Sequence, residues 1–171
     1  PVPRGKAMGG TSAINGQTFI RGTPEDFDTW ASWGNDEWSY INCLPFFRKL
    51  ESDEDYSGDF HGTEGPVPVR RHHRETWPAV QEAFYQACIA AGYPDFPDIH
   101  EPDSTGISLR AENNVDGVRM SMALAYLDPN RHRVNLTVKA GAQVLKIIFS
   151  GPRATGLEVE SGGERFTVEG D

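Results

Sequence analysis

Residues able to take part in chemistry are concentrated near the start of the chain, where residues 3–22 contain five glycines. Two basic side chains precede the glycine pair Gly9-Gly10, and the hydroxyls of Thr11 and Ser12 follow it. Because glycine has no side chain, the pair lets a ligand lie against the backbone and allows positive φ angles. The hydroxyls can cap a short helix whose free N–H groups would face an anion. These residue types predict a cradle for a phosphate-bearing ligand, with a tight turn and a capped helix as the alternative.

The full pattern of this stretch resembles the first signature of the glucose–methanol–choline (GMC) family of FAD-dependent alcohol oxidoreductases. That signature joins a glycine and a basic residue to a glycine pair, small residues, an aliphatic residue and an asparagine. Aromatic, small and polar positions follow. The matching residues here are Gly5, Lys6, Gly9, Gly10, Thr11, Ser12, Ile14, Asn15, Phe19, Gly22 and Asp28. Met8 replaces the usual branched aliphatic residue with one of similar bulk.

The resemblance implies FAD as the cofactor and assigns its contacts. The implied cofactor-binding residues are Gly9, Gly10, Thr11, Asn15, Gly16, Thr18 and Val144. Val144 would meet the adenine through its backbone, and Asn15 either hydrogen-bonds the flavin edge or ends the preceding helix. Some family members link FAD covalently through a histidine directly before the signature asparagine. Ile14 stands at that position and has no nucleophile, so we expect FAD to be held without a covalent bond.

Three further segments resemble family motifs and follow in family order. His61-Gly62-x-x-Gly65-Pro66 matches a segment that leads into a strand of the substrate domain. Residues 117–127 match a helix with the pattern Gly-x-Arg-x-Ser and a closing Tyr-Leu, and the closing strands complete the series. Trp38-Ser39-Tyr40 and the tryptophan-containing helices are most similar to the choline-dehydrogenase-like branch. The resemblance therefore covers nearly the whole chain.

The fold implied by the resemblance is α/β plus α+β. Residues 1–35 and 129–171 are expected to belong to an FAD-binding domain, and residues 36–128 to a substrate or cap domain. In this family a C-terminal histidine takes the alcohol proton while hydride passes to the flavin, and oxygen or another acceptor then takes the electrons. Neither that histidine nor the N-terminal GxGxxG unit is found here. We therefore expect a central fragment with no catalytic residue, inactive alone, from an enzyme that oxidises a small-molecule alcohol.

Composition excludes several other classes of function. The chain has 171 residues, of which 37% are apolar and 24% charged, and its formal charge is −9. This acidic balance argues against binding to nucleic acid or to an anionic membrane surface. No apolar run approaches the ~20 residues that a membrane-spanning helix needs. Cys43 and Cys88 lack metal or redox spacing and are expected to be buried thiols.

Two alternative functions remain open from the sequence. Residues 53–64 have the acidic, serine, glycine and glutamate positions of an EF-hand calcium loop, although residues 65–69 cannot form its second helix. We favour an acidic loop that enters a strand. A non-catalytic domain with the same FAD fold is the other alternative. The basic run Arg70–Arg74 is expected to be a solvated loop, and its histidine pair has no further ligands that would form a metal site.

Local patterns predict the remaining elements. Helices are expected from residue 23 to 32, 38 to 50 and 76 to 91, and the family resemblance implies a further helix at residues 117–127. The third helix should bury Val80, Phe84, Ala87, Cys88 and Ala91 on one face. Strands are expected at residues 107–111, 135–138, 142–149, 154–160 and 166–168. Arg119 is either a partner for a phosphate or carboxylate or part of a salt bridge that fixes a helix start. Substrate identity and oligomeric state do not follow from the sequence.

Overall fold

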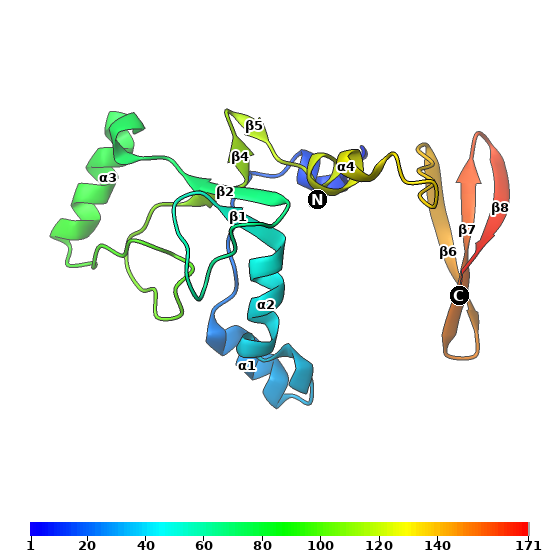
Figure 1. Cartoon of the computed structure of the whole chain (residues 1–171), viewed down its shortest axis with the longest axis horizontal. Helices are drawn as coiled ribbons and strands as arrows, with labels where there is room; N and C mark the ends of the chain where they lie inside the picture. The colour runs from blue at the N-terminus through cyan, green and yellow to red at the C-terminus, as the bar shows by residue number, and fades with distance from the viewer. Residues whose placement is uncertain (171) are drawn as a thin grey trace. The chain divides into compact units, whose positions relative to one another are not determined.

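The computed structural model describes residues 1–170, which fold as two compact units (Figure 1). The first unit spans Pro1–Pro129 and mixes helices with short strands. The second unit begins at Asn130 and contains an antiparallel sheet. The chain is therefore of mixed helix and sheet class, as expected. No helix within residues 1–170 is both long and apolar enough to cross a membrane.

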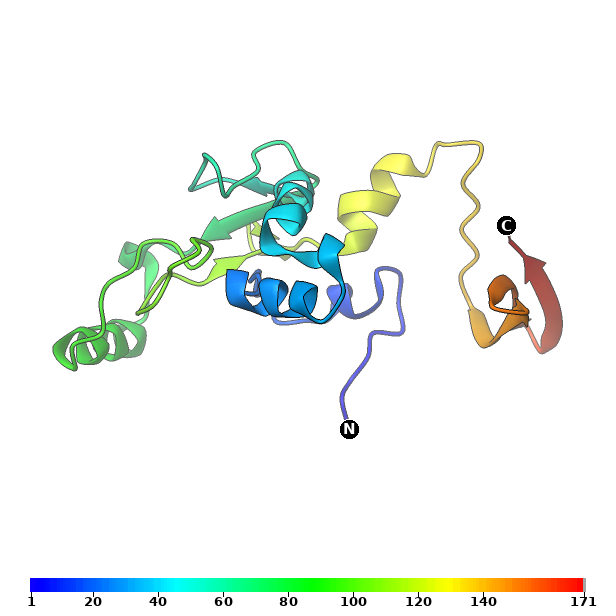
Figure 2. The same ribbon diagram turned by 90° about the horizontal axis from the view of Figure 1, so that it is seen from below.

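Two helices form the main apolar core of the first unit. Helix α1 (Pro24–Ser32) begins with a capping box, in which Thr23 and Asp26 each bond the other's backbone N–H. Helix α2 (Tyr40–Leu50) follows a 3₁₀ turn, η2 (Asp36–Trp38), and lies beside α1 (Figures 1 and 2). The buried side chains between these helices are Phe27, Tyr40 and Leu44, with Cys43, Phe47 and Phe60 packed around them.

Phe46 and Trp30 of these helices are exposed, and the cysteines differ from expectation. Phe46 is 72% exposed, because the buried Tyr40 and Leu44 and the half-buried Phe47 follow the helical period and residue 46 falls on the opposite side. Trp30 is exposed as well, and its ring packs edge-on against Phe27 and Trp38. Cys43 and, in helix α3, Cys88 are free thiols of intermediate exposure rather than fully buried ones.

A three-stranded sheet lies at the centre of the first unit. Strand β1 (Glu51–Asp53) pairs in parallel with β2 (Val67–Arg71), and β2 pairs antiparallel with β3 (Ala111–Glu112). Along β2 the buried residues alternate, so Val67, Val69 and Arg71 share one buried face. The prediction of a solvated basic loop was therefore wrong for Arg71, because the strand period places it inside.

Helix α3 (Ala79–Ala90) begins later than predicted. Thr76 belongs to a separate 3₁₀ turn, η3 (Arg74–Thr76), and Pro78 occupies the N-cap position. Tyr85 is its buried residue and packs against the ring of Trp77, whereas Val80 and Phe84 are 76% and 67% exposed. The predicted core face was wrong within the described residues, because a period of apolar residues identifies a face and not what covers it.

The segment after α3 contains a long loop and a hairpin. A long loop covers residues 93–105, and the predicted strand at 107–111 is reduced to β3 with one bridge at Ile107. Strands β4 (Asn114–Val115) and β5 (Val118–Arg119) form a hairpin. Its turn residues, Asp116 and Gly117, have φ of 50° and 80°, the geometry that an Asp-Gly pair favours.

The helix predicted from residue 117 begins only after this hairpin. A π-helix, η4 (Ala123–Leu127), continues into the short helix α4 (Asp128–Asn130). Arg119 therefore lies on a strand and does not mark a helix start. Ser121 is buried and caps the first turn, since its hydroxyl accepts the Leu124 N–H at 3.4 Å.

The second unit is a meander of three strands. Strands β6 (Ala142–Ser150), β7 (Arg153–Ser161) and β8 (Glu164–Glu169) are paired antiparallel in chain order. Gly151, Gly162 and Gly163 have positive φ at the two turns, as the sequence predicted. The predicted strand at residues 135–138 is wrong: this segment has no ladder partner within residues 1–170.

Candidate cofactor-binding site

The glycine pair forms a left-handed entry into a short turn. Gly9 and Gly10 have φ of 85° and 57°, and Gly10 begins a four-residue 3₁₀ turn, η1 (Gly10–Ala13). The Gly10 N–H bonds Ala7 O at 2.9 Å and the Ser12 N–H bonds Gly9 O at 3.2 Å. Thr11 and Ser12 were expected before the helix start. They lie inside the turn instead, because the two positive φ angles start it at Gly10.

The backbone of this turn is tight on one side and open on the other. A Cβ on Gly5 would lie 2.2 Å from Gly10 O, so no side chain fits there. The Thr11 hydroxyl accepts the Gly5 N–H at 3.2 Å and thereby closes the loop. On the other side, a Cβ on Gly10 would meet no atom of residues 1–170 within 4 Å. The chain therefore has an open glycine face that a bound group can approach closely, as an FAD phosphate or ring requires.

The rest of the signature is tied to the strands that follow the long loop. Asn15 Oδ1 accepts the Gln17 N–H at 3.1 Å, and Thr18 forms an antiparallel bridge with Glu112. The Phe19 N–H bonds Ala111 O at 2.8 Å. Asn15, Gly16 and Thr18 remain exposed, so the Asn15 amide and the Thr18 hydroxyl face away from the packed interior. The sheet thus holds this arm by its backbone and leaves its polar groups accessible.

The structure places six of the seven predicted cofactor residues in one stretch of the first unit. Val144 belongs to β6 in the second unit, where it pairs with Val159 and is 52% exposed. An adenine contact through the Val144 backbone stays a prediction.

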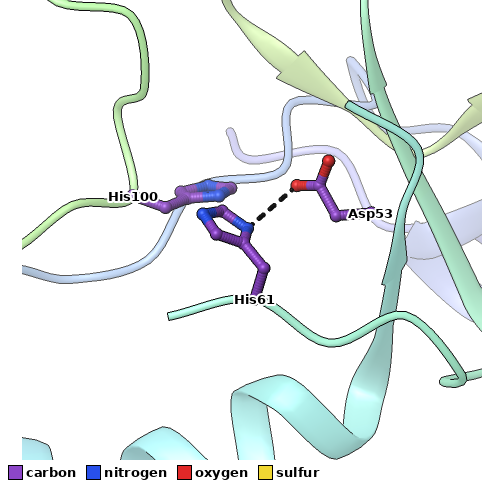
Figure 3. A group of neighbouring side chains, drawn as sticks. All are labelled: Asp53, His61 and His100. Carbon is purple, nitrogen blue, oxygen red and sulfur yellow. Dashed lines mark hydrogen bonds and ion pairs between the residues drawn. The ribbon is translucent and has the colours of Figure 1, made fainter. Parts of the chain in front are cut away.

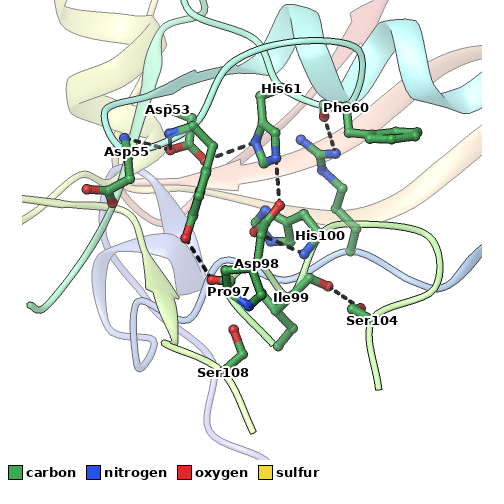
Figure 4. A network of polar contacts seen from close by, with 12 residues as sticks. Asp53, Asp55, Phe60, His61, Pro97, Asp98, Ile99, His100, Ser104 and Ser108 are labelled. Atoms are coloured by element: carbon green, nitrogen blue, oxygen red, sulfur yellow. Dashed lines mark hydrogen bonds and ion pairs between the residues drawn. The ribbon is translucent and has the colours of Figure 1, made fainter. Parts of the chain in front are cut away.

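A buried cluster of charged side chains was missed by the sequence analysis. We call it the ionic cluster; its members are Arg21, Glu51, Asp53, His61, Arg71 and Asp98. His61 points between two carboxylates, with Nδ1 3.1 Å from Asp53 Oδ2 and Nε2 2.7 Å from Asp98 Oδ2 (Figure 4). Arg71 bonds the same two carboxylates, at 2.8 Å and 2.9 Å. Buried charges of opposite sign are thus paired throughout the cluster.

The cluster keeps His61 protonated. Burial by itself would lower the pKa of His61, but its hydrogen bonds to Asp53 and Asp98 outweigh burial and raise the pKa to about 10. Burial raises the pKa of Asp53, whereas its bonds from His61 and Arg71 lower that pKa well below the usual range. Burial raises the pKa of Asp98, but the bond from His61, the bond from the His100 N–H and the nearby positive charges of His61 and Arg71 together lower it. His61 is therefore an imidazolium ion with both N–H groups donated.

Three side chains of this region have the spacing of metal ligands. Suitable atoms of Asp53, His61 and His100 lie within 4.8 Å of one another (Figure 3). However, both His61 nitrogens are bonded to carboxylates, and both Asp53 oxygens accept from Arg71. His100 donates its Nε2 proton to Phe19 O at 3.0 Å, and burial lowers its pKa, so it is neutral. The ligand atoms of Asp53 and His61 are thus used for hydrogen bonds and ion pairs, whereas His100 Nδ1 is buried without a hydrogen-bond partner among the described residues.

The same contacts give no support to the calcium-loop alternative. Asp53, the first acid of the supposed loop, lies on strand β1 and is buried by its bonds to His61 and Arg71. Asp55, the second acid, accepts the Arg71 N–H at 2.7 Å. Oxygens committed to these partners do not form an open calcium shell.

The ionic cluster and the neighbouring His100 also anchor the later part of the signature. Arg21 bonds Glu51 at 2.5 Å and Phe60 O at 2.6 Å, and His100 holds the carbonyl of Phe19. The sequence contained one signal for this cluster. Charged residues stand at the alternating, buried positions of two strands: 51 and 53 on β1, and 71 on β2. This signal was hidden because β1 has only three residues.

Comparisons with known proteins agree with this geometry. A sequence profile described as GMC oxidoreductase matches residues 1–170. An uncharacterised GMC-type oxidoreductase in the thcA 5′ region of Rhodococcus erythropolis is 40% identical over 99% of this chain and 34% of its own length. An oxygen-dependent choline dehydrogenase of Yersinia pseudotuberculosis is 42% identical over 93% of this chain and 28% of its own length.

The fold is found in solved structures as well. The crystal structure of pyridoxine 4-oxidase from Mesorbium loti has a TM-score of 0.88 and 29% identity, covering 97% of this chain and 33% of that one. The chain belongs to the GMC oxidoreductase family, whose members are FAD-dependent. It spans about a third of the length of the curated relatives it matches.

Proposed function

We propose that this chain is part of a longer flavoprotein that oxidises an alcohol by passing hydride to FAD. The observation that carries the proposal is the open glycine face at Gly10, in a chain of this family. This chain covers about a third of the length of its relatives, which supports the proposal that other residues supply the rest of the enzyme. In that view residues 1–35 and 129–171 serve the FAD-binding domain and residues 36–128 the substrate domain.

Within that enzyme the signature residues bind and orient FAD without a covalent bond. The open face of Gly10 admits a phosphate-bearing group against the backbone, where nearby N–H groups and the basic residues upstream favour negative charge. The Thr11 hydroxyl accepts from Gly5 and keeps its own proton available to donate. The exposed Asn15 amide and Thr18 hydroxyl are suited to hydrogen-bond the flavin edge. FAD, when bound, supplies the acceptor for the hydride.

We assign no catalytic residue within this chain, and we propose that the chain by itself is inactive. His61, a buried imidazolium, is hydrogen-bonded to a carboxylate through each ring nitrogen and is unsuited to accept an alcohol proton. The named relatives act on choline and pyridoxine, which are small alcohols. A small-molecule alcohol as the donor, and oxygen or another acceptor for the electrons, complete the proposed reaction.

The test is an anaerobic titration of the purified full-length protein with a panel of small alcohols. Loss of the oxidised flavin absorbance on adding an alcohol is the expected result, and choline paired with its O-methyl ether is a matched control. The ether lacks the O–H proton that alcohol oxidation releases, so it should leave the spectrum unchanged. A full-length protein that carries no flavin and takes up none would contradict the proposal.

A further inference from the structure

The segment after the β4–β5 hairpin holds the signature turn at several points. Nη1 of Arg119 donates to the carbonyl of Ala13, the last residue of the turn, at 2.8 Å. The N–H of Met122 donates to the Ser12 hydroxyl at 2.9 Å. That hydroxyl in turn donates to Gly9 O at 2.5 Å. A chain of hydrogen bonds therefore runs from residues 119–122 to both ends of the turn.

The glycine turn also packs directly against the start of the π-helix. A Cβ on Gly9 would lie 3.2 Å from Ala123 N and 3.3 Å from Ala123 Cβ, so the backbone of the turn lies against the first residue of the π-helix. The first N–H groups of a helix have no partner within the helix. The Ser12 hydroxyl satisfies the Met122 N–H, which lies just before the π-helix. The turn and residues 119–122 therefore satisfy each other's polar groups.

We propose that Arg119 and Ser12 are positioning residues that hold the glycine turn in the conformation that accepts FAD. The proposal rests on the function proposed above. This role differs from both roles considered for Arg119 from the sequence, because it rests on the bond from Nη1 to a backbone carbonyl of the signature. Neither residue is assigned a contact with the cofactor.

The physical reason is preorganisation. Two consecutive residues with positive φ and a four-residue turn give little intrinsic stability, so the turn depends on outside contacts. If only a fraction of molecules holds the competent conformation, the apparent dissociation constant rises by the inverse of that fraction. Suppose that without the Arg119 bond only about a tenth of the molecules hold the turn in the conformation that binds FAD. The apparent dissociation constant for FAD then rises about tenfold.

The test uses four variants of the full-length protein: Arg119→Met, Arg119→Lys, Ser12→Ala and Arg165→Met. Arg165 is an exposed arginine paired with Glu160 in the second unit and is the matched control. Amide hydrogen exchange of the flavin-free protein is measured first. The amides of Gly10, Ser12, Ile14 and Asn15 each bond within residues 7–15, so they report on the turn directly.

Arg119→Met and Ser12→Ala should speed exchange at these four amides about tenfold and weaken FAD binding, measured by quenching of flavin fluorescence, by a similar factor. Arg119→Lys should recover part of the loss because it keeps one donor, and Arg165→Met should change neither quantity. The loss of FAD affinity in Arg119→Met should persist at high salt, because it does not arise from a broken ion pair with FAD.

Unchanged exchange in both Arg119→Met and Ser12→Ala would overturn the inference, as would a loss of affinity that vanishes at high salt. Ser12→Ala, which removes only one hydroxyl, keeps the test valid if Arg119→Met fails to fold. Faster exchange with unchanged FAD affinity would have a different meaning. This result would show that Arg119 and Ser12 stabilise the turn, but it would overturn the proposal that the turn must be held in this conformation to bind FAD.

Discussion

Nε2 of His61 lies 2.7 Å from Oδ2 of Asp98, although the two residues are 37 positions apart in the chain. This bond joins the segment after β1 to the long loop over residues 93–105. Through Arg71 and Asp53 the same group of charges reaches strands β1 and β2. The long loop is therefore fixed to the central sheet mainly by buried ions.

Replacing His61 should strongly destabilise the first unit. His61→Phe keeps a ring of similar size but leaves Asp53 and Asp98 short of a buried cation. Breaking a buried ion pair in this way costs about 3–5 kcal/mol. The measurement is urea unfolding, with His132→Phe as the control because His132 is exposed. If the free energies of unfolding of both variants lie within about 0.5 kcal/mol of the parent value, the ionic cluster does not stabilise the fold.

The raised pKa of His61 predicts how stability depends on pH. The folded-state pKa is about 10 and the unfolded value is 6.5, so the contribution is complete below pH 6.5 and is lost as pH rises toward about 10. Within that window the folded state holds one more proton, and stability should fall by about 1.4 kcal/mol per pH unit from this group. The advantage of the parent over His61→Gln should therefore shrink with rising pH. A constant advantage between about pH 7 and 9 would contradict the assigned pKa.

The isolated chain of 171 residues should bind FAD weakly or not at all. It carries the glycine turn but lacks the strand–GxGxxG–helix unit that grips the ADP half in dinucleotide-binding domains. Purification should give a colourless protein, and titration with FAD should show little quenching of flavin fluorescence. A yellow preparation with one FAD per chain would show that these residues suffice for binding.

Local signals in the sequence were enough for several elements. Helix α1 could be placed because Thr23, Pro24 and Asp26 act within one turn, and the β6–β7 hairpin because Gly151 sits between two apolar runs. The Asp116-Gly117 turn carried an equally local signal, and overlooking it produced a helix that began too early. These features depend on residues that are close in the chain.

The ionic cluster could not be predicted in the same way. It requires that β1 pair in parallel with β2 and that Asp98 return to the same place from a long loop. Arg71 looks like part of a basic surface run until β2 is known to be a strand with one buried face. Likewise, the signature predicted the cofactor residues from local spacing, but the bond to Ala13 O comes from Arg119, which lies 106 positions further along the chain.

Flavin in the full-length protein should be released by acid. Ile14 directly precedes Asn15 and has no nucleophile, so the covalent route used through a histidine at that position is closed. After acid precipitation the yellow colour should stay in the supernatant. A fluorescent pellet that retains flavin would show a covalent link at another residue.

The central claim, that the open face of Gly10 receives FAD, is tested most directly by the affinity of Gly10→Val for FAD. The parent, Gly10→Val, Thr11→Ala and Gly151→Val are compared as flavin-free full-length proteins. Gly151→Val is the matched control because Gly151 has φ of 61°, close to 57° at Gly10, so both changes strain the backbone alike. At either glycine a Cβ would meet no atom of residues 1–170 within 4 Å.

Gly10→Val should weaken FAD binding at least about a hundredfold, because its side chain fills the space that the ligand needs. Thr11→Ala should weaken the free energy of FAD binding by about 1 kcal/mol, the contribution of one hydrogen bond. Gly151→Val should leave the dissociation constant unchanged. Equal affinities for Gly10→Val and Gly151→Val, or equal losses from Gly10→Val and Thr11→Ala, would contradict close approach of FAD to the Gly10 backbone.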